Sequence, residues 1–95
     1  MRTLEAAADI ATSMGLTQEE MLQQAMVTFL IEKKRRLMQD RLEIMARYGV
    51  SSLEELEERI ASGDVAEHPT WEDLIVAENL TAKVAELDRY LQRLR

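Results

Sequence analysis

The stretch from Gln18 to Tyr48 contains neither glycine nor proline, and three apolar pairs recur within it at intervals of seven residues. The pairs are Leu30-Ile31, Leu37-Met38 and Ile44-Met45. A repeat of seven residues corresponds to two turns of an α-helix and is not a strand pattern. The stretch therefore predicts a single helix, which at about 1.5 Å per residue would be roughly 46 Å long.

A helix of this length constrains the shape of the molecule. The chain has 95 residues, enough for one domain, and we treat 1–95 as a single helical domain. A compact domain of that size has a radius of gyration of about 12 Å and a diameter near 32 Å. We therefore expect the helix to protrude from the domain or to span a dimer.

The rest of the chain also reads as helical, so the predicted fold class is all-α. We expect four helices, at about 4–14, 18–48, 52–62 and 70–94. Each of the first three is followed by a glycine, the residue that most often ends a helix; these are Gly15, Gly49 and Gly63. Thr17 with Glu20, and Thr70 with Asp73, have the spacing of helix-starting caps.

The last helix carries a coiled-coil seam. Its apolar residues alternate steps of three and four: Ala77, Leu80, Val84, Leu87, Leu91 and Leu94. Because short connections favour antiparallel neighbours, we expect a long helical hairpin between 18–48 and 70–94. In this arrangement Leu37-Met38 and Ile44-Met45 meet the seam, whereas Leu30-Ile31 belongs to a helix-turn-helix-like dimerisation part at 1–31. Residues 32–95 then form the hairpin and the partner-binding part.

Composition excludes several classes of protein. The net charge of −6 argues against general affinity for nucleic acid, and the absence of cysteine excludes disulfides. The N-terminal segment lacks the pattern of a signal peptide, and no apolar run approaches the roughly 20 residues of a membrane span. We expect a cytoplasmic protein that does not contact membranes.

Charge is unevenly distributed along the chain. Residues 33–48 hold six basic residues against two acidic ones, whereas residues 51–79 hold nine acidic residues against Arg59. The run Lys33-Lys34-Arg35-Arg36 is basic enough to contact phosphate, but four consecutive residues encircle a helix. We favour a solvated collar, paired with acids from the third helix or from a second chain, over a nucleic-acid site.

The acidic segment Glu54-Glu55-Leu56-Glu57-Glu58 also permits a metal interpretation. All-helical nucleotide pyrophosphatases bind magnesium through an E-E-x-x-E motif that Glu54, Glu55 and Glu58 match, and carboxylates suit this hard cation. The second E-x-x-D half of that motif is absent, so we favour a solvated acidic face without metal or cofactor. His68 reads as an exposed loop residue, and no catalytic residue is assigned.

Residues 4–31 resemble the two helices of ribbon-helix-helix proteins. The matching elements are Gly15, Leu16-Thr17, Glu20-Met21-Leu22, Ala25 and Leu30. Members of that family place a DNA-reading strand before the first helix, where this chain has only Met1-Arg2-Thr3, so no base-contacting residue is carried over. The resemblance implies a homodimer held by the N-terminal helices, and the expected interface is Met21, Leu22, Met26, Phe29, Leu30 and Ile31.

The segments ARYGVSSLEELEERIASGDV and HPTWEDLIVAENL are similar to antitoxins of prokaryotic toxin–antitoxin pairs, in which a Trp-containing final helix follows an acidic one. This resemblance implies a C-terminal region that wraps a toxin. The partner-binding residues we expect are Glu54, Glu55, Glu58, Glu67, Trp71 and Leu74. The position of Trp71 in the first turn of the last helix by itself favours closing the end of the hairpin, and anchoring a partner is the alternative for this residue.

The favoured function is thus a non-catalytic, antitoxin-like protein that neutralises a cytoplasmic toxin, because an acidic segment is suited to masking a basic surface. The first alternative is a structural helical oligomer or adaptor. A metal-dependent nucleotide pyrophosphatase is a further alternative.

Overall fold

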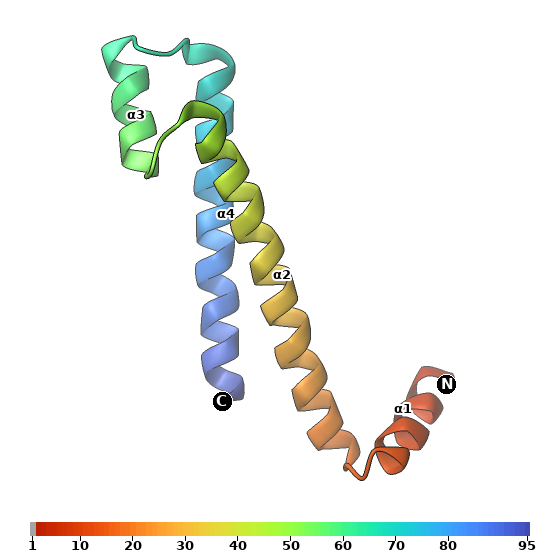
Figure 1. Ribbon diagram of the computed structural model, residues 1–95. Coiled ribbons are helices and arrows are strands. Elements are labelled where there is room, and N and C mark those ends of the chain that lie inside the picture. The colour runs from red at the N-terminus through yellow and green to blue at the C-terminus, as the bar shows by residue number, and fades with distance from the viewer. Residues whose placement is uncertain (1) are drawn as a thin grey trace.

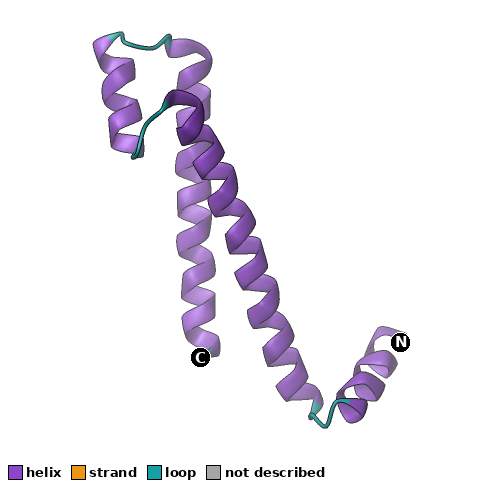
Figure 2. Ribbon diagram, viewed as in Figure 1, coloured by secondary structure: helices purple, strands orange, loops and turns teal. Residues whose placement is uncertain are grey.

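The computed structural model describes residues 2–95, and the regular elements in that range are all α-helices (Figure 2). They are α1 (Arg2–Ser13), α2 (Gln18–Tyr48), α3 (Leu53–Ser62) and α4 (Glu67–Leu94). The predicted all-α class and the order of four helices are confirmed. Arg2 and Thr3 belong to α1, and Met1 lies outside the described residues. Within residues 2–95, no helix has the long apolar stretch that a membrane span requires.

The molecule is elongated because α2 is longer than the core that the chain can build around it. α4 runs antiparallel beside α2, α3 packs at one end of this hairpin, and α1 diverges from α2 at the other end (Figure 1). The protein measures 60 × 25 × 18 Å, with a radius of gyration of 19.5 Å. A compact chain of this length would have a radius of gyration of about 12 Å.

Local sequence determines where α2 and α3 begin. The Glu20 amide donates to the Thr17 hydroxyl and the Thr17 amide donates to the Glu20 carboxylate, both at 3.0 Å, so the predicted capping box is confirmed. Gly49 ends α2 in the left-handed region at φ +63°, where a residue without Cβ is unstrained. At the start of α3, the Ser52 hydroxyl accepts a hydrogen bond of 3.1 Å from the Glu55 amide.

The start of α4 differs from the prediction. Thr70 does not cap the helix, because it lies beyond the first residues of α4 and is buried. A non-helical residue, His68, interrupts the first turn, and Pro69 then opens the regular part of α4. Proline is well suited to that place because the missing amide would have no helical partner. The Asp73 carboxylate accepts a hydrogen bond from the Tyr48 hydroxyl on α2.

The predicted antiparallel hairpin is confirmed, and its seam follows a spacing of three and four residues on both helices. The buried apolar residues of α4 are Leu74, Ala77, Val84, Leu87 and Leu91. On α2 the buried and half-buried residues of the seam are Val27, Leu30, Lys34, Leu37, Arg41, Ile44 and Tyr48. At the far end of the seam, the Gln23 side-chain amide donates to the Leu94 carbonyl oxygen at 2.6 Å.

The three apolar pairs of α2 do not each pack on one neighbour as predicted. Leu30, Leu37 and Ile44 fall on the seam, whereas Ile31 and Met38 remain exposed. Consecutive residues lie about 100° apart around a helix, so both members of a pair cannot face the same partner. Leu30 therefore belongs with α4, not with the N-terminal helices.

Two polar contacts replace apolar ones within the seam. Lys34 Nζ lies 2.7 Å from Asp88 Oδ1, and Arg41 donates to the Thr81 hydroxyl at 3.1 Å. The Arg41 Nε atom is buried and has no hydrogen-bond partner among residues 2–95. Charged residues at seam positions cost stability but disfavour other alignments of two helices. These two contacts are made in the alignment of α2 and α4 that the structure shows.

The best-packed part of the molecule is the end of the hairpin that carries α3. Val50, Leu56, Ile60 and Leu74 form a buried cluster there, and Met45 of α2 packs against it. Leu56 and Leu74 are the largest fully buried side chains. The cluster joins three helices and fixes α3 relative to the start of α4.

We expect Leu74→Ala to lower the free energy of unfolding by about 2–5 kcal/mol, because it removes a buried side chain and leaves a cavity. Chemical denaturation followed by circular dichroism measures this loss. Ile75→Ala is the matched control, since the neighbouring side chain is 43% exposed, and should change stability by only about 0.5 kcal/mol. Equal losses for the two variants would contradict the packing described.

Candidate functional site

A groove lies between α3 and the first turns of α4. It has a volume of about 510 Å³ and is lined by Glu57, Ile60, Ala61, Glu67, His68, Trp71 and Glu72. The Trp71 side chain is 48% exposed, so it does not close the end of the hairpin. An indole in this position offers a flat apolar surface and one N–H donor to an incoming molecule.

α3 is held in place by its buried apolar residues and by Arg59. Leu56 and Ile60 enter the core, and the Arg59 guanidinium donates to the Tyr48 carbonyl oxygen at 2.8 Å. The same guanidinium contacts the Glu55 carboxylate at 3.0 Å. Arg59 thus holds α3 against the end of α2. α3, which forms one wall of the groove, therefore has a fixed position.

The opposite wall is fixed by a link from α2 to α4. The Tyr48 hydroxyl and Arg47 Nη1 both donate to Asp73 Oδ2, the latter at 3.2 Å. The hydrogen bond to Asp73 raises the pKa of the Tyr48 phenol, and burial adds to this shift. Asp73 is therefore engaged by Tyr48 and Arg47, and it is not among the residues that line the groove.

Two carboxylates of the groove remain available to a cation. Within residues 2–95, Glu57 and Glu67 have no hydrogen bond or ion pair, whereas Glu72 lies 2.7 Å from His68 Nδ1. Unpaired carboxylates around an apolar surface attract positively charged groups. The groove can therefore receive a basic side chain beside Trp71.

The predicted partner-binding residues do not all share this site. Glu67 and Trp71 lie together in the groove, and Glu54 and Glu58 are exposed on α3. Leu74 is 1% exposed, so its assignment to the partner surface is corrected: its apolar side chain stabilises the core. These positions follow from the helical period, which turns neighbouring residues toward different surroundings.

Glu55 also lies outside the groove. Its carboxylate accepts hydrogen bonds from the Ser51 amide at 3.0 Å and from Arg59, so it caps α3. Glu57 takes its place as the α3 carboxylate of the site, although the sequence reasoning missed it. The signal was present, because Leu53, Leu56 and Ile60 define a buried stripe, and Glu57 lies four residues after Leu53 and three before Ile60, at the edge of that stripe.

No group of three or more histidine, aspartate or glutamate side chains in the described part of the chain is placed to hold a metal ion. The Glu55 oxygens are engaged by Ser51 and Arg59. Within residues 2–95, Glu54, Glu55 and Glu58 therefore do not form a group of carboxylates placed around a cation.

The basic run on α2 is largely paired within the chain. Arg35 and Arg36 contact Glu32 of the same helix, at 2.6 and 3.8 Å, and Lys34 contacts Asp88 of α4. The hydrogen bond from Arg35 lowers the pKa of the Glu32 carboxyl and raises the pKa of the guanidinium. The predicted collar is present, but its acidic partners come from α2 and α4 and not from α3.

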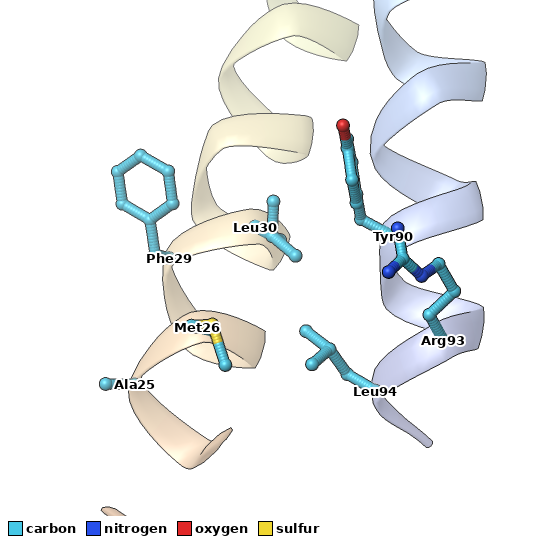
Figure 3. Close-up of a pocket in the computed structure, with 7 residues that line it drawn as sticks. All are labelled: Ala25, Met26, Phe29, Leu30, Tyr90, Arg93 and Leu94. Carbon is cyan, nitrogen blue, oxygen red and sulfur yellow. The ribbon is translucent and has the colours of Figure 1, made fainter. Parts of the chain in front are cut away.

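The residues predicted for a dimer interface fall around the other end of the molecule. Met26, Phe29 and Leu30 line a groove between α2 and α4, in which Leu30 and Leu94 point toward each other and Phe29 points away from α4 (Figure 3). Met21 lines a second groove, between α1 and α2. Leu22 and Ile31 are exposed and line neither groove.

In a comparison with known families, residues 1–95 match the uncharacterized protein MJ0235 family. The chain belongs to this family. No curated protein and no solved structure matches it. In this member of the MJ0235 family, the grooves described above lie at the two ends of the molecule.

We expect acid to weaken α3 through Glu55. Hydrogen bonds from Ser51 lower the pKa of the Glu55 carboxyl, so the folded state favours the charged form. The resulting stability is complete above the ordinary glutamate pKa of about 4.3 and is lost as the pH falls through the folded-state value. Glu55→Gln should remove this contribution and reduce the loss of stability between about pH 5 and pH 3, measured by thermal unfolding.

Glu58→Gln is the control for this titration. Within residues 2–95 the Glu58 side chain forms no hydrogen bond or ion pair, so the substitution should preserve the wild-type acid response. An acid response of Glu55→Gln equal to that of the wild type would argue against the cap.

Proposed function

We propose that this protein is a non-catalytic module that binds a basic partner protein through the groove between α3 and α4. The observation that carries the proposal is the half-exposed Trp71 beside Glu57 and Glu67, two carboxylates without partners in the described chain. Tryptophan is enriched among the residues that dominate binding energy. Complementary charge around it steers a partner and orients it.

The rigidity of the site supports this proposal. Trp71 precedes the core residue Leu74 by one helical turn, and Arg59 and Asp73 fix the two walls of the groove. A preformed site loses little conformational freedom when a partner binds. The resemblance to antitoxins makes a nucleic-acid-directed toxin with a basic surface the partner class to test first, in the cytoplasm.

The first test is co-expression with the products of the genes that flank this one, followed by calorimetric titration of any product that co-purifies. We expect Trp71→Ala to raise the dissociation constant by at least about 30-fold, the effect of losing a dominant contact. Tyr90→Ala is the matched control, because this half-exposed aromatic residue lies near the other end of α4 and should leave binding unchanged.

Removing the charge of the two groove carboxylates is a second part of the same test. Glu57→Gln together with Glu67→Gln should slow association and flatten its dependence on salt, because steering by exposed charge is screened by ions. Glu78→Gln, an exposed carboxylate outside the groove, is the control. Failure of every flanking product to bind, or an equal loss in Tyr90→Ala, would contradict the proposal.

A second candidate, a structural helical oligomer or adaptor, is favoured by the exposed apolar residues near α1. Leu22, Met26 and Phe29 are among the exposed large apolar side chains of α2. Light scattering separates the candidates, because an assembly protein should form species larger than a dimer.

A further inference from the structure

An apolar face covers the end of the molecule where α1 meets α2. One groove of about 610 Å³ lies between α2 and α4, and a second groove of about 750 Å³ lies between α1 and α2. Ala25 and Phe29 line both grooves. This part of α2 is therefore a ridge with an apolar groove on each side, and we call the whole surface the α1-end face.

Large apolar side chains of the α1-end face are open to solvent. Phe29 is 67% exposed and Met14 is 68% exposed, and Ile10 and Tyr90 are also exposed. Single exposed apolar residues are ordinary on protein surfaces, but a contiguous group of them marks an interaction site. The α1-end face thus has the composition of an interface.

The total surface area shows that the elongated chain leaves more surface uncovered than a compact protein does. The protein exposes 7094 Å². A compact protein of the same mass would expose about 5,600 Å², roughly 1,500 Å² less. A standard interface covers about 800 Å² of each partner, so the excess is enough for a stable dimer.

We propose that a second copy of this chain covers the α1-end face in a two-fold symmetric homodimer, with the ridge around Ala25 and Phe29 at its centre. A two-fold interface brings the same patch of both subunits together, so the patch must complement itself. The α1-end face meets this condition because it holds both a protruding Phe29 and grooves large enough to receive the partner's phenyl ring.

Charge at the edge of the face is compatible with self-association. Glu32, Lys33 and Arg36 border the groove between α1 and α2. Because this border carries both signs, two identical copies do not meet as surfaces of one charge. The acidic groove beside Trp71 would oppose a second copy of itself, and its residues belong to α3 and the first turns of α4. These elements lie at the other end of the molecule (Figure 1).

This dimer interface differs in part from the one predicted from sequence, and it does not include the groove beside Trp71. Met21, Met26, Phe29 and Leu30 belong to the α1-end face, whereas Leu22 and Ile31 lie outside its grooves. Both copies of the groove beside Trp71 stay open in this dimer. Loss of one activity therefore does not imply loss of the other.

The test is the mass of the full chain in solution, measured by light scattering and sedimentation over a range of concentrations. We expect about twice the 10.9 kDa of one chain. Phe29→Asp should raise the dimer dissociation constant by at least about 30-fold, because it places a charge at the centre of an apolar interface. Circular dichroism checks that this variant remains helical.

Leu42→Asp is the matched control, since Leu42 is an exposed apolar residue of the same helix outside both grooves. It should leave the dimer intact. A monomeric wild-type protein at about 100 µM, far above the range of stable dimers, would overturn the proposal. A dimer that survives Phe29→Asp, or one that is lost only in Leu42→Asp, would also overturn it.

Cross-linking locates the two-fold axis without a destabilising charge. The natural chain has no cysteine, so Ala25→Cys and Leu42→Cys each introduce a single thiol. Oxidation should link two chains through Ala25→Cys, because residues near a two-fold axis lie close to their own copies. Covalent dimers from Leu42→Cys and not from Ala25→Cys would place the interface elsewhere.

Discussion

The antiparallel contact between α2 and α4 is the constraint on which the rest of the molecule depends. Two helices can bury only one stripe each against one another, so most of the surface of α2 has no partner within the chain. Lys34 and Arg41 add polar contacts to that stripe. The core at one end of this hairpin and the exposed apolar surface at its other end depend on which helix packs against each end.

At one end of the hairpin, the short helix α3 covers apolar surface of α2 and α4. α3 adds Leu56 and Ile60 to the hairpin and creates the one region where three helices share a core. The same packing places the Trp71 indole beside Glu57 and Glu67, which have no ion-pair partner within residues 2–95, so the core and the candidate binding site depend on the same contacts. At the other end α1 diverges from α2, and no comparable core forms.

Features determined by neighbouring residues could be predicted from the sequence. The Thr17–Glu20 capping box, the glycine after α2 and the period of the seam are local, and each appears in the structure. The Asp73 contact with Tyr48 joins residues 25 positions apart, so the spacing of Thr70 and Asp73 suggested a cap instead. The place of Glu57 in the groove likewise depends on how α3 packs against the start of α4, although the buried stripe of α3 indicates which side of that helix Glu57 occupies.

α2 is one continuous helix, but its residues are less tightly packed near its N-terminal end than near its C-terminal end. Ile44, its one buried residue within the described chain, lies near the C-terminal end of α2, and the residues around Gln23 are mostly exposed. The free energy of local opening follows the apolar contacts that a segment makes. Backbone amides in the first turns of α2 therefore exchange with solvent more readily than those near Ile44, although one helix contains both. Any molecule that docks on the α1 end acts on the least protected part of this helix and slows its fraying.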